Sequence, residues 1–333
     1  MTPAPAIAVF LVSIAVMLAA AAVFASRLDH IGLRLGLPEA LLGLLTALAA
    51  DAPEISSAIS ALVQHEHAVA VGVVVGSNAF NIAAMLGLSA VVTAHVRARH
   101  ETLELEAFVG LWLLAVTLAI VAGGIGGIAG GVLIAAVTVP YVGLLAAGPR
   151  ITRRLRLGAV ESRFVGRSFG EPHVPAPGLD SRTEALGLLF ILAGALAVIV
   201  AGSVAAVRAA TDLAHDWSVP KAIVGVIVLA ILTSLPNAWT GVRFGLQGRG
   251  SALMSETLNS NSINIVAGLA LPAALGTFGA FSHLDVFDVA WLLGMTAAAL
   301  VLFGRRGGAR RSAGVFLIVL YAAFLAAQIA ART

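Results

Sequence analysis

Long apolar runs divide this chain, with short breaks of charged residues, Gly and Pro between them. A transmembrane helix needs about 20 mostly apolar residues. Ten runs meet this length within a few residues: 5–26, 37–63, 68–92, 106–122, 127–147, 184–208, 219–244, 252–276, 285–303 and 313–331. Barrel strands would alternate in polarity over about ten residues, whereas these runs are continuous. Only 11% of the residues are charged, against roughly 25% in soluble domains. The pattern predicts an all-α polytopic membrane protein.

The basic residues orient these spans. With the N-terminus outside, seventeen of the 20 Lys and Arg residues fall in inner segments, and only Arg208, Lys221 and Arg332 lie outside. This asymmetry is the positive-inside bias, and it predicts that both termini lie outside. It also accounts for the pI of about 10.1, because the arginines anchor the inner face, near anionic lipid. We expect the lipid bilayer as a partner and no nucleic acid.

The first apolar run could also be read as a cleaved signal peptide. No positive charge precedes residues 3–25, however, and Arg27 follows them. Because a signal peptide carries its positive charge before the apolar stretch, we favour a first membrane helix.

The longest break, residues 148–183, is rich in Arg, Pro and Gly. This composition is typical of a linker, and we expect a basic cytoplasmic linker between two five-helix halves, 1–147 and 184–333. A role of this segment in binding lipid or a regulatory partner is the alternative.

A repeat relates the two halves at a fixed offset. Residues 46–87 align without a gap on residues 229–270. Both stretches carry a proline and, further on, the pattern Ser-Asn-x-x-Asn: Pro53 with 77–81, and Pro236 with 260–264. Because five spans separate the copies, the second copy crosses the membrane in the opposite sense. Inverted repeats of this kind are typical of secondary transporters, whose substrate site lies at the midplane where the repeats meet.

Two carboxylates, Asp51 and Glu54, lie inside an apolar run and share one helical face. Acids inside a membrane are costly and mark ion paths. Prolines nearby free the carbonyl oxygens around 49–50 and 232–233, and such oxygens bind hard cations. Oxygen ligands without sulfur suit Na⁺, Ca²⁺ or a proton. The alternative for Asp51 is a helix N-cap, and for Glu54 a neutral, hydrogen-bonded structural carboxyl.

At these residues the chain resembles the cation/calcium exchanger superfamily, and most closely its sodium/calcium exchangers. That family carries two inverted repeats, each with a G-T-S-L-P-E-L-like motif followed by G-N-x-x-G-S-N-x-x-N/D. The corresponding segments here are "AADAPEI" (49–55) with "GVVVGSNAFN" (72–81), and "LTSLPNA" (232–238) with "SETLNSNSIN" (255–264). The resemblance implies a cation site built by the second, third, seventh and eighth helices.

The residues that match the family's ligand positions are Glu54, Ser77, Asn81, Thr233, Ser234, Ser260 and Asn264. The chain departs from the family at Asp51, where the first repeat has Ser, and at Asn237, where the second repeat has Glu. Further departures are Ser255 and Glu256 in place of Gly-Asn, and Asn259 in place of Gly. We add Asp51, Asn237 and Glu256 to the predicted site.

Purely structural roles are the alternatives for these residues. The hydroxyl residues could be small packing residues, and the asparagines could bridge helices. Glu256 could instead lie at the inner mouth and pair with Arg249.

We therefore expect a secondary antiporter that exchanges Ca²⁺ against Na⁺ or H⁺, with these ions as substrates and no cofactor. By resemblance, the first and sixth helices would slide to gate the site, and a monomer is implied, although the sequence leaves the oligomeric state open. The alternatives are a monovalent Na⁺/H⁺-type exchanger and a transport-inactive scaffold or receptor. We do not expect an enzyme: the chain has no Cys, and its His residues lie in loops or near span ends.

Overall fold

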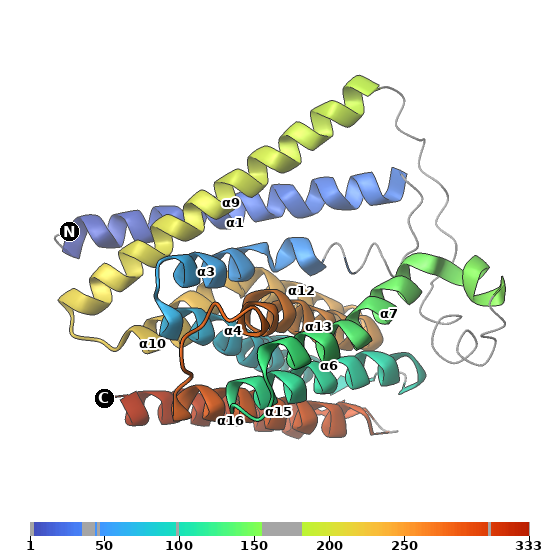
Figure 1. The fold of residues 1–333 in the computed structure, drawn as a ribbon. Helices are drawn as coiled ribbons and strands as arrows, with labels where there is room; N and C mark the ends of the chain where they lie inside the picture. Colours follow the sequence, from blue (N-terminus) through green and yellow to red (C-terminus); the bar gives the residue numbers. More distant parts are fainter. Residues whose placement is uncertain are drawn as a thin grey trace.

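A computed structural model of the chain describes residues 3–34, 44, 47–97, 100–154, 182–305 and 308–332. Nearly all of this part is helical (Figure 1). The first half contains α1 (Pro3–Arg34), α3 (Ala52–Val63), α4 (His67–Asn81), η1 (Ile82–Leu88), α5 (Ser89–Thr93), β1 (His95–Val96), α6 (His100–Val121) and α7 (Gly127–Arg154). The second half contains α9 (Arg182–Asp216), α10 (Lys221–Ile223), η3 (Val224–Leu229), α11 (Ala230–Thr233), α12 (Leu235–Leu246), α13 (Gly250–Ile265), η4 (Val266–Ala270), α14 (Leu271–Ala274), α15 (His283–Phe303), β2 (Ala309–Arg310) and α16 (Arg311–Arg332).

Seven helical stretches in the described part are long and apolar enough to cross a membrane, and there are eight if the bent pair Lys221–Thr233 and Leu235–Leu246 counts as one span. The two other predicted spans are less apolar or shorter. The described part of the second predicted span contains the 12-residue α3, while residues 35–43, 45 and 46 lie outside the described part. In the eighth predicted span, α13 carries Ser, Thr, Glu and Asn side chains at most positions. The structure thus shows a mostly helical multi-pass membrane protein, and the count of ten stays a prediction.

Two long helices, α1 and α9, lie side by side along one edge of the molecule, whereas α15 and α16 lie at the opposite edge (Figure 1). Side chains such as Leu11 on α1 and Phe190 on α9 are 57% and 77% exposed. Exposed apolar side chains on these helices are what a lipid-facing surface requires. The inner helices α3, α4, α12 and α13 lie between the two edges (Figure 1).

Glycines allow two of the inner elements to cross closely. A Cβ atom on Gly76 of α4 would lie 2.8 Å from the Ala230 Cβ atom, and one on Gly225 of η3 would lie 2.7 Å from the Val69 carbonyl oxygen. Both distances are shorter than van der Waals contact. Small residues at such crossings are the usual means by which membrane helices approach each other.

Three π-helical segments, η1, η3 and η4, were not foreseen from the sequence. Segment η1 begins directly after Asn81, and η4 begins two residues after Asn264. Because a π-segment widens the helix by one residue per turn, it changes which side chains face inward, and such segments are frequent at functional sites. The remaining regular structure in the described residues is a two-residue antiparallel ladder between β1 and β2.

The predicted linker, residues 148–183, lies mostly outside the described residues. Helix α7 continues to Arg154 and α9 begins at Arg182, and residues 155–181 are not described.

Candidate functional site

Asp51 lies at the turn that precedes α3, and its side chain does not cap that helix. Its backbone has φ −82° and ψ −3°, and no side-chain capping hydrogen bond is formed. The Asp51 Oδ1 atom instead accepts hydrogen bonds from the Asn237 amide at 2.8 Å and from the Ser260 hydroxyl at 2.7 Å. The structure therefore does not support the capping alternative. It directs this carboxylate toward α12 and α13.

Glu54 joins the same network one helical turn further on. Its Oε1 atom accepts hydrogen bonds from the Ser234 hydroxyl at 2.9 Å and from the Asn237 amide at 3.3 Å. Asp51, Glu54, Ser234 and Asn237 are all at most 3% exposed. Asn237 thus holds both carboxylates, and the two broken helical stretches, around residues 51 and 234, meet at their breaks.

Prolines explain why the helices break at these positions. Pro53 lies in the first turn of α3 and Pro236 in the first turn of α12. Since proline has no amide hydrogen, the carbonyls of Ala49 and Leu232 lack their usual helical donors. The second break bends its helix pair by 49°. The missing donors at Pro53 and Pro236 are expected to leave these two backbone oxygens free to bind a cation.

The side chains of α4 and α13 complete the network. The Asn81 amide donates to the Ser260 hydroxyl and to the Asn261 side-chain oxygen, both at 3.2 Å. The Ser260 hydroxyl also accepts a hydrogen bond from Asn237 at 3.3 Å. Ser260 therefore links the carboxylate of Asp51 to α4.

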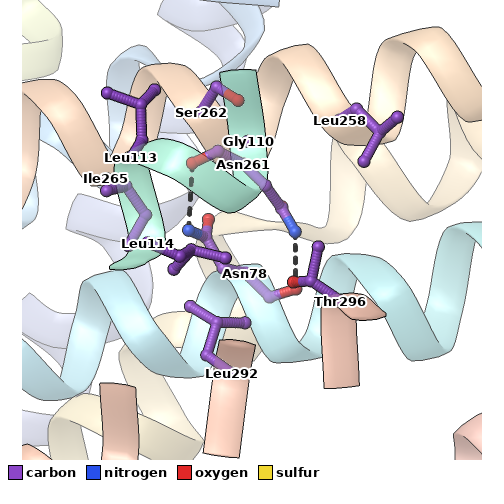
Figure 2. A pocket seen from close by; sticks show the side chains of 10 residues that line it. All are labelled: Asn78, Gly110, Leu113, Leu114, Leu258, Asn261, Ser262, Ile265, Leu292 and Thr296. Carbon is purple, nitrogen blue, oxygen red and sulfur yellow. Dashed lines mark hydrogen bonds between the residues drawn. The ribbon is translucent and has the colours of Figure 1, made fainter. Parts of the chain in front are cut away.

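A reciprocal pair of asparagines fastens α4 to α13 beside the site. The Asn78 side-chain amide donates to the Asn261 backbone carbonyl at 3.1 Å, and the Asn261 side-chain amide donates to the Asn78 backbone carbonyl, also at 3.1 Å. Figure 2 shows both hydrogen bonds as dashed lines, with Leu292 and Thr296 of α15 close by. A cavity of about 10 Å³ lies against the pair. Both residues belong to the repeated Ser-Asn-x-x-Asn pattern, but neither is among the predicted site residues.

Four oxygen atoms of predicted site residues are buried and accept no hydrogen bond from the described residues. They are Asp51 Oδ2, Glu54 Oε2, Asn81 Oδ1 and Asn264 Oδ1. A buried polar atom without a partner costs about 1–3 kcal/mol, and more when it is charged. Two carboxylate and two amide oxygens are also the ligand types that Ca²⁺ and Na⁺ take in proteins. The described residues hold no group of three or more His, Cys, Asp or Glu suited to a metal ion, so any cation here relies on amide, hydroxyl and carbonyl oxygens besides the two acids.

The remaining predicted site residues are arranged differently. The hydroxyls of Ser77 and Thr233 donate to carbonyls of their own helices, Val74 at 3.1 Å and Leu229 at 2.9 Å. Asn264 is buried, and neither its amide nitrogen nor its oxygen has a partner among the described residues.

Glu256 is only partly buried. No ion pair joins it to Arg249 in the described part of the chain, and the Arg249 guanidinium lies 4.8 Å from the centre of the Phe244 ring. Glu256 interacts electrostatically with Asp51, but no hydrogen bond joins it to the network among the described side chains.

Comparison with known proteins places this geometry in context. The sequence matches the family model described as "Sodium/calcium exchanger protein" over residues 5–143 and 187–330. It is 31% identical over 126 residues to sodium/potassium/calcium exchanger 4 of Mus musculus, which covers 34% of this chain and 20% of that protein. The chain thus spans about a fifth of the length of that relative.

A second relative aligns over most of both chains. Inner membrane protein YrbG of Escherichia coli (strain K12) is 25% identical over 299 residues, which covers 85% of this chain and 84% of YrbG. The crystal structure of the H⁺/Ca²⁺ exchanger CAX shares the fold, with a TM-score of 0.74, 14% sequence identity and coverage of 96% of this chain and 82% of that chain. Because the family match extends over most of the 333 residues, the chain belongs to the sodium/calcium exchanger protein family.

Proposed function

We propose that this protein is a secondary-active antiporter that exchanges Ca²⁺ against Na⁺ or H⁺ by alternating access, and that it is not an enzyme. The observation that carries the proposal is the set of four buried, unpartnered oxygens on Asp51, Glu54, Asn81 and Asn264. Buried oxygen atoms that accept no hydrogen bond destabilise the protein unless a cation binds them. The family match and the CAX fold support the same class of function.

The charge of the site explains how the fluxes of the two exchanged ions are coupled. Asp51 and Glu54 carry two negative charges when ionised, and buried charges are destabilising unless they are balanced. One divalent ion balances them, and so do two monovalent ions or protons. Ca²⁺ and the monovalent ions or protons compete for the same oxygens. An empty site with two buried negative charges is costly, so the protein does not change between its inward- and outward-open states without a bound ion. Each ion therefore crosses only in exchange for the other.

Reciprocal contacts support the proposed inverted repeat. Residues 54 and 237, and residues 51 and 234, are each related by the 183-residue offset of the repeat. The bond from Ser234 to Glu54 and the bond from Asn237 to Asp51 therefore join pairs of positions that the repeat exchanges, although both are donated by the second repeat. The Asn78–Asn261 pair is reciprocal. Contacts that exchange under such an offset are expected when a two-fold axis relates the halves.

We also propose the membrane topology that the sequence predicts. It places ten spans in two inverted halves, 1–147 and 184–333, with both termini outside and the linker 148–183 in the cytoplasm. Helices α1 and α9 lie at one edge (Figure 1) and contact α3, where the Ser60 and Ser203 hydroxyls are 2.8 Å apart. We propose that this pair slides to open the site to one side or the other.

A monovalent cation exchanger is the second candidate. The observation that favours it is Asn237. In the family that the chain resembles, this position of the second repeat is a glutamate, so the site has one carboxylate fewer there. Asp51 adds one in the first repeat, where that family has Ser.

Transport assays separate these candidates. Purified protein in proteoliposomes is expected to take up Ca²⁺ when a Na⁺ or pH gradient is imposed, and Glu54→Gln is expected to abolish the uptake. Na⁺/H⁺ exchange without Ca²⁺ uptake would favour the second candidate. No flux of any of the three ions, together with no ion-dependent stabilisation, would instead indicate a transport-inactive protein.

A further inference from the structure

A partly buried glutamate, Glu106 on α6, lies outside the proposed exchange site. The Glu106 Oε1 atom accepts hydrogen bonds from the Ser255 hydroxyl at 2.6 Å and from the Asn259 amide at 3.4 Å. Tyr141 of α7 donates to the Asn259 side-chain oxygen at 2.6 Å. Three helices thus build one polar cluster in an otherwise apolar contact.

The two oxygens of this carboxylate differ. All the donors go to Oε1, whereas Oε2 is buried and has no hydrogen-bond partner among the described residues. No Lys, Arg or His side chain forms an ion pair with Glu106 in the part of the chain that the structure describes. Glu106 also lies within the candidate membrane span Glu104–Val121. An ionised carboxylate with one desolvated, unbalanced oxygen is costly at this position.

The surroundings of Glu106 favour a proton over a metal cation. The Ser255 hydroxyl is used as a donor to Glu106, and the Asn259 oxygen is occupied by Tyr141. Few oxygens therefore remain to coordinate a metal ion, which takes six or more ligands in the case of Ca²⁺. A proton needs only the free Oε2 atom.

The donors to Glu106 come from positions where this chain departs from the motif it resembles. Ser255 and Asn259 stand where the exchanger motif has glycine, and they lie four residues apart on one face of α13. Glycine has no side chain with which to hold a carboxylate. The pairing with Glu106 is therefore a feature of this chain's own residues.

We propose that Glu106, held by Ser255, Asn259 and Tyr141, is a proton-binding site separate from the exchange site. A proton from water binds Oε2, and Oε1 remains the acceptor for Ser255 and Asn259. The ionisable groups that interact electrostatically with Glu106 are Glu256 on α13 and Tyr141 on α7.

Infrared difference spectroscopy of the purified full-length protein tests this site directly, without cation transport. We expect the spectrum at about neutral pH to contain a carboxylic-acid carbonyl band that disappears in Glu106→Gln. In Ser255→Ala, which keeps the carboxyl group, the band is expected to remain but to move to higher frequency, because its carbonyl loses a hydrogen bond. The matched control is Glu104→Gln on the same helix, which should leave the band unchanged.

The absence of such a band in the wild type between about pH 6 and pH 8 would overturn the proposal. A band whose frequency is unchanged in Ser255→Ala would also overturn the proposal. This result is informative even if Glu106→Gln fails to fold. Loss of the band on adding Na⁺ at fixed pH would show that a metal cation occupies the site instead. Since none of these readouts depends on exchange, the proposed function and the proton site can fail separately.

Discussion

Replacing Glu54 with Gln is expected to abolish Ca²⁺-dependent stabilisation while the fold is retained. The Gln carbonyl can keep the position of Oε1 and accept the hydrogen bonds from Ser234 and Asn237. The Gln amide nitrogen then takes the position of Oε2, which is buried and unpartnered in the wild type. A hydrogen-bond donor thereby replaces a charged oxygen that faces the proposed cation.

The size of the effect follows from the charge that is lost. Removing one partner of a buried charge pair costs about 3–5 kcal/mol, and each 1.4 kcal/mol is about tenfold in affinity. We therefore expect the Ca²⁺ affinity to fall by a factor of about 10² to 4 × 10³. At a Ca²⁺ concentration about 100 times the wild-type Kd, the wild type gains about 2.7 kcal/mol by mass action. The variant should then gain less than about 0.5 kcal/mol at the same concentration.

A thermal-shift titration at constant ionic strength measures this difference. Each kcal/mol corresponds to about 2–4 °C in proteins of 150–250 residues, so the wild type should gain several degrees with Ca²⁺ and the variant almost none. The matched control is Glu66→Gln, because Glu66 is a partly exposed acid paired with Lys221 at 2.6 Å. A Ca²⁺ shift in Glu54→Gln as large as in the wild type, or its equal loss in the Glu66 control, would refute the reasoning.

Three further predictions follow from the packing and charge of the described residues. Gly76→Ala should lower the melting temperature, because its Cβ atom would lie 2.8 Å from Ala230 and overpacking costs about 1–3 kcal/mol; Gly143→Ala, which meets nothing within 4 Å, should not. Asp288→Asn should destabilise the protein by about 3–5 kcal/mol, as measured by thermal unfolding in detergent, because the buried Asp288 pairs with Arg332 at 2.7 Å; unchanged stability would contradict this. Asn237→Glu should make Ca²⁺ uptake depend on an additional monovalent cation, because a third buried charge then needs balancing, and flux measured with and without Na⁺ checks it.

Much of the polar network around Asp51 and Glu54 could be predicted from the repeat. Two prolines at the 183-residue offset located both helix breaks, and the acids and amides next to them supplied Asp51, Glu54 and Asn237. Helical spacing also predicted that Ser260 and Asn264 share a face of α13. These predictions rest on local chemistry, because a proline removes a donor wherever it lies and residues four apart share a helix face.

Other features depend on how the helices pack, which no local pattern encodes. The hydroxyls of Ser77 and Thr233 turn to carbonyls of their own helices, an option that Ser and Thr have in any helix. The pairing of Glu106 with Ser255 requires that α6 and α13 meet at that depth, and spacing along one helix does not determine its neighbour. The π-segments η1 and η4 depend in the same way on contacts with neighbouring helices, so the sequence alone did not reveal them.

The asymmetry between Asn81 and Asn264 bears on how the proposed exchange could work. These residues are equivalent under the repeat, yet Asn81 bonds to Ser260 and Asn261, whereas the Asn264 side chain has no partner among the described residues. The partners equivalent to Ser260 and Asn261 are Ser77 and Asn78, and the Asn78 side-chain oxygen is likewise unpartnered. If the halves exchanged conformations, Asn264 would gain these bonds as Asn81 lost its own, and the Asn78–Asn261 pair would be kept. The same number of hydrogen bonds in both arrangements is what a transporter needs, because two states of similar free energy can then be shifted by the bound ion alone.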